Sequence, residues 1–194
     1  DYRRYYFPRL ALGKNDFSSA VNIDCPDDAS AFRTKPPEKT WDRAIGAPGK
    51  GALRLCNAIP KVTIWSAEPP SQIPSQHRLR LAALAKVAGV EGKGVFLRVR
   101  YHTFVWRPHP HVEWVKTLES QPLRGTTQEW QPIEVPPLEV PAEHFDYLVW
   151  IDVILDGCGT AWITDMEVDL QPAGAEAPLA PEDAPTGSRS PAKR

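Results

Sequence analysis

The stretch VFLRVRYHTF at residues 95–104 decides the fold class, because apolar residues alternate in it with a mixed aromatic and charged set. In an extended strand, successive side chains point to opposite faces of the sheet. One face of this segment carries Val95, Leu97, Val99 and Tyr101. The other face carries Phe96, Arg98, Arg100, His102 and Phe104. The pattern predicts a β-strand that buries its apolar face in a core and presents aromatic and charged groups on the opposite face.

The stretch YLVWIDVIL at residues 147–155 repeats this alternation. Its expected inward set is Tyr147, Val149, Ile151, Val153 and Leu155, and its outward set is Leu148, Trp150, Asp152 and Ile154. If the two strands are neighbours, a candidate ligand or partner face contains Arg98, Arg100, His102, Phe104, Trp150 and Asp152. Such a face can stack on a sugar ring or bury against another protein, unless a loop or the N-terminal segment covers it.

Composition extends the prediction from these two strands to the whole chain. Among 194 residues there are 21 prolines and 12 glycines, which suit short strands joined by turns better than long helices. The expected strands are 52–57, 61–66, 77–88, 94–106, 112–118, 128–135, 147–155 and 161–170. Residues 25–50 are expected to form a long loop with Trp41 as its apolar plug. The sequence therefore predicts an all-β fold, an antiparallel sandwich of two sheets.

Both ends of the chain differ from this predicted sandwich. Residues 1–17 form an expected aromatic and basic arm that docks on a partner or covers the sandwich edge, and its candidate docking residues are Tyr2, Arg3, Arg4, Tyr5, Tyr6 and Phe7. Residues 172–194 are rich in Pro and Ala, which predicts a flexible tail. The sandwich itself is expected to occupy residues 18–171.

Charge and hydropathy exclude some classes of function. The formal net charge of -1 supplies no basic field, so no nucleic-acid partner is expected. No stretch approaches the roughly 20 apolar residues that span a bilayer. The chain starts at Asp1 and its one methionine is Met166, so we expect that a signal or membrane anchor preceded Asp1. This favours an extracytoplasmic location, periplasmic or secreted.

Three segments stand out within residues 77–170: HRLRL at 77–81, PLRGTTQEWQ at 122–131 with its G-T-x-x-W pattern, and LDGCGTAWITDMEV at 155–168. Through these segments, this part of the chain resembles the galactose-binding-like jelly rolls found in carbohydrate-binding modules of secreted glycoside hydrolases. The resemblance implies a jelly roll whose ligand is a glycan. Trp162 is expected to face the core beside Met166 and Val168.

The same family often carries a structural calcium between its first and last strands. The matching residues are Asp16, near the start, and Asp165, in the closing motif. Two departures from the family pattern are Ser18 in place of a glutamate and Thr164 in place of the first closing aspartate. A structural calcium is therefore one expectation, and a surface or hydrogen-bonded role for Asp165 is the other. No other cofactor is expected.

Catalytic patterns are weak in this sequence. His109, His111 and Glu113 suggest a cupin-like metal site, but the spacing differs from the cupin motif and no second motif follows. No G-x-S-x-G elbow is present, and paired carboxylates for glycoside hydrolysis stay open because their separations are unknown. Trp65, Trp106 and Trp114 lie near predicted strand ends and are candidates for binding at loop tips.

Three functional hypotheses follow. The first is a non-catalytic structural or docking subunit that binds a larger, membrane-associated protein assembly through its arm, face and tail. The second is a carbohydrate-binding module. The third, and weakest, is a metal-dependent cupin-like or glycan-active enzyme.

Overall fold

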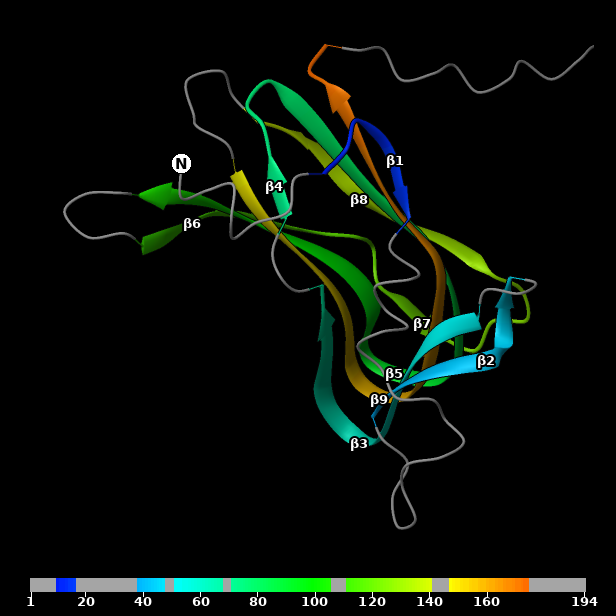
Figure 1. Ribbon diagram of the computed structural model, residues 1–194. Helices are drawn as coiled ribbons and strands as arrows, with labels where there is room; N and C mark the ends of the chain where they lie inside the picture. The colour runs from blue at the N-terminus through cyan, green and yellow to red at the C-terminus, as the bar shows by residue number, and fades with distance from the viewer. Residues whose placement is uncertain are drawn as a thin grey trace, which may run out of the picture.

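The computed structural model describes residues 10–16, 38–47, 51–67, 71–105, 111–140 and 147–174. These residues form nine strands and no helix (Figure 1). The strands are β1 (Gly13–Asp16), β2 (Lys39–Ala47), β3 (Gly51–Ser66), β4 (Ser71–Ile73), β5 (His77–Val105), β6 (His111–Glu119), β7 (Leu123–Gly125), β8 (Gln131–Glu139) and β9 (Tyr147–Pro172). Every pairing between them is antiparallel, so the all-β prediction is confirmed. Within the described ranges, no helix is long and apolar enough to cross a membrane.

Three long strands connect the two layers of the sandwich. The hydrogen-bonded order is β2-β3-β9-β5-β6, with β1 and β4 added beside β9 and with β7 and β8 beside β5. The first half of β5 pairs with β8 and with the last part of β9, and the second half pairs with β6 and with the first part of β9. Because β3, β5 and β9 bend sharply midway, one continuous sheet folds over into two layers (Figure 1).

Glycines allow the bends of β5 and β9, and their positions correct the predicted strand ends. The sequence predicted that strands end at residues 88 and 155 and that new strands begin at 94 and 161, whereas β5 and β9 run through both gaps with shifts in register. Gly157 has φ +136°, and a Cβ there would collide with the backbone carbonyl of Glu91 on the neighbouring strand. A glycine inside a strand can mark a bend as well as a turn. The composition alone did not separate these two cases.

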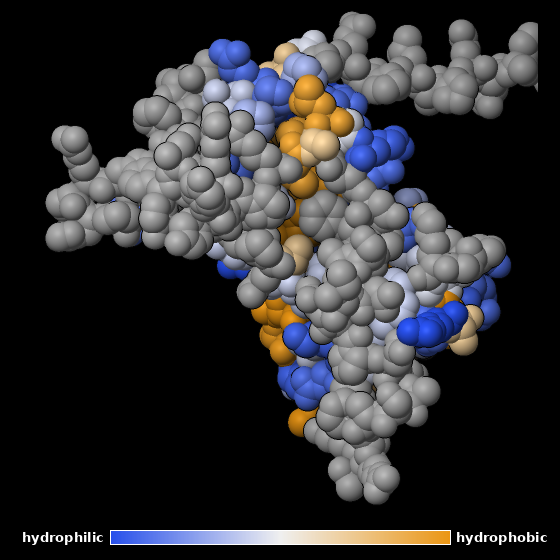
Figure 2. Space-filling model, viewed as in Figure 1, coloured by the Kyte–Doolittle hydropathy of each residue, from blue (hydrophilic) through white to orange (hydrophobic). Residues whose placement is uncertain are grey.

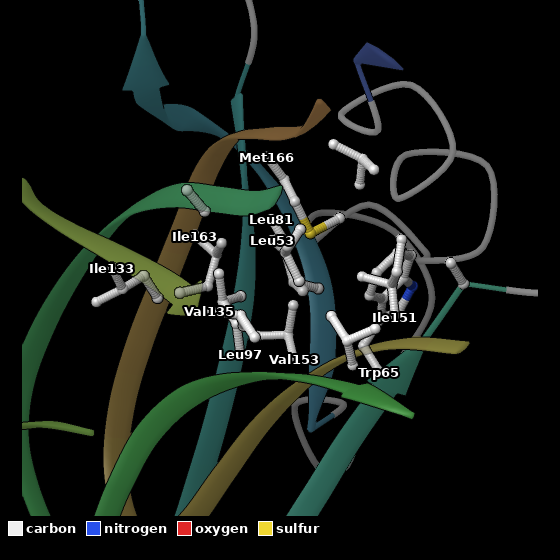
Figure 3. Close-up of a cluster of buried hydrophobic side chains, with 14 of the residues drawn as sticks. Leu53, Trp65, Leu81, Leu97, Ile133, Val135, Ile151, Val153, Ile163 and Met166 are labelled. Carbon is white, nitrogen blue, oxygen red and sulfur yellow. The ribbon is translucent and has the colours of Figure 1, made fainter. Parts of the chain in front are cut away.

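The core lies between the two layers. Leu53, Leu81 and Ile163 reach it from one layer, and Leu97 and Ile151 reach it from the other (Figure 3). The inward residues predicted for 95–101 and for 147–155 are all buried in this cluster. Each of the two stretches therefore has the sidedness that its alternation predicted.

The predicted loop at 25–50 is partly wrong. Residues 39–47 form β2, which pairs with β3, and Trp41 on that strand is only 5% exposed. The expected burial of Trp41 is thus correct, although a strand and not a loop supports it. Residues 25–37 and 48–50 lie outside the described residues.

The expected core position of Trp162 is also wrong. Trp162 is half-buried on the outer surface, opposite Arg54 of β3 and Lys86 of β5, and its indole nitrogen donates to the Asp42 carboxylate at 3.1 Å. Asp165 explains the error, because it has φ +48° and lies where the β5–β9 register shifts. One extra residue in a strand reverses the faces of all residues before it. Counting back from buried Met166 therefore gave the wrong face.

Candidate functional site

Strands β5 and β9 are neighbours, so most of the predicted face residues meet. In the register, Arg98 lies opposite Asp152, and Arg100 lies opposite Trp150. His102 follows on the same side of β5. Phe104 continues the strand, but its side chain lies outside the described part of the structure.

Asp152 is the centre of this arrangement and is completely buried. Its Oδ2 accepts hydrogen bonds from Arg98 Nε and Arg100 Nε, both at 2.8 Å. Its Oδ1 accepts from Ser66 Oγ at 2.6 Å and from Arg100 Nη2 at 3.0 Å. Burial alone would raise the pKa of Asp152, but the hydrogen bonds from Arg100, Ser66 and Arg98 outweigh it and hold the pKa below its ordinary value. Asp152 therefore stays ionised and fixes both guanidinium groups.

Two aromatic rings lie beside the arginines. The rings of His102 and Trp150 are 4.6 Å apart in an edge-to-face arrangement, and the Arg100 guanidinium is 5.7 Å from the centre of the Trp150 ring. Burial, followed by the positive charge of Arg100, lowers the pKa of His102. The imidazole is therefore neutral at neutral pH, and its buried Nδ1 has no hydrogen-bond partner among the described residues.

Strand β6 adds Trp114, which sequence reasoning assigned to a loop tip. Trp114 lies opposite His102 in the register and therefore shares its face, and 65% of its surface is exposed. The indole nitrogen donates to Thr117 Oγ1 at 3.0 Å, which holds the ring in a defined orientation. We define the Arg98–Asp152 face by Arg98, Arg100, His102, Trp114, Trp150 and Asp152.

Trp114 could not be placed on this face from the sequence, because that placement required knowledge of which strand pairs with β5. A register shift between Tyr101 and His102 complicates the pairing further. Trp65, another candidate for a loop tip, is 2% exposed in the core, so that prediction is wrong. Trp106 lies outside the described residues.

The same side of the sheet becomes apolar toward the bend. Phe96 and Ile154 lie opposite each other and are buried, whereas Val62 and Ile64 of β3 remain 55% and 36% exposed. Figure 2 shows orange, apolar surface interspersed with blue, hydrophilic surface over the region of β3. Lys93 lies 4.0 Å above the Phe96 ring and also pairs with Glu119 of β6 at 2.7 Å.

The remaining predicted site residues are not brought to this face. Asp16 lies at the end of β1, opposite Glu167 of β9, and Asp165 precedes Glu167 by two positions. The side chain of Asp16 lies outside the described part of the structure. Among the described residues, no group of three or more His, Cys, Asp or Glu side chains could hold a metal ion. The structural calcium therefore stays a prediction.

The histidine-rich segment lies on β6 where it is described. His111 Nε2 and Glu113 Oε1 are 2.9 Å apart, and both side chains are largely exposed. His109 lies outside the described residues, as do the arm residues Tyr2, Arg3, Arg4, Tyr5, Tyr6 and Phe7 and the tail from 175 to 194. The docking arm thus stays a prediction as well.

The other layer carries a cleft of about 430 Å³ on its outer surface, between residues of β1, β5, β8 and β9. Arg80 and Glu134 line it and form a two-point ion pair, with both hydrogen bonds at 2.7 Å. Their side chains are 48% and 42% exposed. This pair offers a second arginine–carboxylate cluster for comparison.

No family model and no curated protein matches the chain. Among solved structures it is similar to a family 16 carbohydrate-binding module, at 13% identity over 69% of this chain and 82% of that one, with a TM-score of 0.43. It is also similar to a family 30 carbohydrate-binding module, at 12% identity over 84% and 94% of the two chains, with a TM-score of 0.42.

A third similar structure is the enzymatically active domain of bacteriophage CBA120 tailspike protein 4, at 12% identity with a TM-score of 0.41. That match covers 62% of this chain and only 16% of the tailspike chain. All three TM-scores are below 0.5, so the all-β architecture of this chain rests on its own strand pairing and not on these likenesses.

Proposed function

We propose that the chain is a non-catalytic glycan-binding module that uses the Arg98–Asp152 face. The observation that carries the proposal is the exposed Trp114 ring, held by Thr117 on a strand that also brings it beside His102. Sugars present apolar C–H faces that stack on aromatic rings, and hydroxyls that need hydrogen-bonding groups. A binding site of this kind combines aromatic surface with a few well-placed polar groups.

The polar groups of this face are already fixed before any ligand binds. Asp152 holds Arg98 through one hydrogen bond and Arg100 through two. Side chains that are ordered in advance lose less entropy on binding, so they bind a ligand more tightly for the same contacts. The face therefore suits a small polar ligand better than a broad protein surface.

A glycosidase would need two carboxyl groups free to exchange protons or attack the sugar. On this face the Asp152 carboxylate is buried and receives four hydrogen bonds, and Glu119 is paired with Lys93. Neither group is placed for that chemistry. The proposed role is thus binding without catalysis, and a glycan ligand favours an extracytoplasmic location.

The docking-subunit hypothesis rested on the N-terminal arm and the tail, most of which lies outside the described residues. No contact among the described residues supports a membrane-associated assembly as the partner. The glycan hypothesis is preferred because it uses side chains whose contacts are defined.

Replacing Trp114 by alanine tests the proposal. We expect the variant Trp114→Ala to bind the glycans that the wild type retains about fivefold more weakly or worse, because each aromatic stack contributes on the order of 1 kcal/mol or more. The melting temperature should change little, because the side chain is 65% exposed. Affinity electrophoresis against neutral and acidic polysaccharides measures the loss.

Trp162→Ala is the matched control, because Trp162 lies on the outer surface of the other part of the sandwich. The folded Trp162→Ala protein should bind glycans as tightly as the wild type does. The proposal fails if the wild type retains no glycan, or if Trp114→Ala binds as well as the wild type.

A further inference from the structure

We infer that the ligand of the Arg98–Asp152 face is an acidic glycan, whose sugar carboxylate binds the guanidinium groups of Arg98 and Arg100. This inference rests on the proposed glycan-binding function and names the class of sugar that the face selects.

The charge on the face is the first reason. Two guanidinium groups share the single carboxylate of Asp152, and their side chains are 23% and 31% exposed. The nearby Lys93 is paired with Glu119, so this pair does not change the net charge of the face. The face therefore keeps one positive charge in excess, although the whole chain has a formal net charge of -1.

The number of hydrogen-bond donors is the second reason. An arginine side chain carries five N–H donors. Asp152 uses only the Nε of Arg98, and it uses the Nε and Nη2 of Arg100. Among the described residues, no other acceptor bonds the terminal nitrogens of Arg98 or the remaining edge of Arg100, so these donors can meet a second acceptor. A carboxylate matches the planar guanidinium and can accept two hydrogen bonds from it.

The Arg80–Glu134 pair shows that the second arginine is not needed to neutralise one carboxylate. There, a single guanidinium satisfies both oxygens of Glu134 at 2.7 Å, even at a half-exposed site. Asp152 receives two guanidiniums and the Ser66 hydroxyl as well. The surplus cation is thus a property of the Arg98–Asp152 face.

The aromatic rings identify the rest of the ligand as a sugar ring and not a free anion. Trp150 lies directly opposite Arg100, whose guanidinium is 5.7 Å from the indole centre. Directly opposite residues on one sheet face touch the same ligand easily. A pyranose with a carboxylate on C5 can place that group at the arginines while its ring contacts an indole.

The decisive experiment compares each acidic glycan with its own neutral counterpart. Isothermal titration calorimetry on the full chain would use oligogalacturonate, oligomannuronate and glucuronate-bearing oligosaccharides. Each would be paired with its carboxyl-reduced form, which keeps the ring and carries a hydroxymethyl group in place of the carboxylate. At least one acid should bind about tenfold or more tightly than its reduced form, because charge-assisted hydrogen bonds are worth more than neutral ones.

Added NaCl should shrink this preference, since the arginines are partly exposed to solvent. If reduced or other neutral glycans bind as tightly as every acid, the inference is wrong while the proposed function stands. If neither acidic nor neutral glycans bind, the proposed function itself fails.

A variant gives the second readout. Arg98→Gln removes the excess charge but leaves Arg100 with both of its hydrogen bonds to Asp152. The acid preference, measured as the ratio of the affinities for the acid and for its reduced form in the same variant, should fall to about onefold. Arg80→Gln makes the same charge change in the cleft of the other layer and should keep the preference.

Arg98→Lys protects this test against misfolding, because it keeps the positive charge beside Asp152. It should retain part of the acid preference, since lysine cannot reproduce the two-point contact of a guanidinium. If Arg98→Gln is folded and still prefers the acid as strongly as the wild type, the arginine assignment is wrong.

Discussion

The two arginine–carboxylate clusters of this chain join the same chemical groups in different surroundings. Glu134 and Arg80 meet in the open cleft, where their side chains are 42% and 48% exposed. Asp152 has no exposed surface and lies under Arg98 and Arg100 on the face of the other layer. In both clusters, hydrogen bonds from arginine lower the pKa of the carboxyl group, although for Asp152 the larger single influence is burial, which opposes them.

Exposure decides what each cluster contributes. An ion pair in water gains little, because the solvent already stabilises both charges and salt screens them. A buried carboxylate has lost its water and depends on every donor that replaces it. The cleft pair is therefore dispensable, and the buried cluster is a fixed part of the architecture.

The largest expected effect follows from breaking the buried cluster. Arg100→Ala removes two of the four hydrogen bonds to Asp152 and leaves a buried charge with incomplete compensation. The free energy of unfolding should fall by about 3 kcal/mol, within the usual range for such a loss. Urea unfolding at neutral pH measures it. A change below about 1 kcal/mol would show that water reaches Asp152.

A smaller loss of stability should appear on acidification. It should come from His102, which lies beside the buried cluster and not in the cleft. The pKa of His102 in the folded chain is lowered from 6.5, so the unfolded chain takes up this proton first as the pH falls. Stability should therefore decrease as the pH falls below about 6.5. His102→Gln should flatten the profile of melting temperature between pH 7 and 5 relative to the wild type, and an unchanged slope would assign the effect to another group.

The smallest effect belongs to the cleft. Arg80→Ala should lower the free energy of unfolding by at most about 1 kcal/mol, the range measured for exposed pairs. The loss should shrink further in high salt. Urea unfolding at low and high NaCl, side by side with Arg100→Ala, gives the contrast directly, and an equal loss in both variants would remove the distinction between the clusters.

The alternation of residues 95–104 and 147–155 was enough to predict which side chains enter the core and which form the candidate face. The period of a strand carries that information within a few residues. Trp114 escaped the prediction because its place depends on which strand pairs with β5 and in what register. The alternation of residues within one strand does not show which distant strand pairs with it.

Two other errors have local causes that composition hides. The turn signals around 89–94 and 156–160 are real glycines, but they bend long strands instead of ending them. Asp165 has a positive φ and lies at the register shift that reverses the face of Trp162, and no glycine in the sequence marks this position. A sequence shows which residues can tolerate a bulge more readily than where a bulge occurs.

The antiparallel ladder between β5 and β9 runs from His77 opposite Pro172 to Thr103 opposite Tyr147. Both layers of the sandwich therefore share β5 and β9. Neither layer can unfold without breaking the hydrogen-bonded ladder that the other layer also uses. We expect the domain to melt as one cooperative unit. Because the paired residues lie so far apart along the chain, the ladder also gives a high contact order, which is characteristic of slow folding.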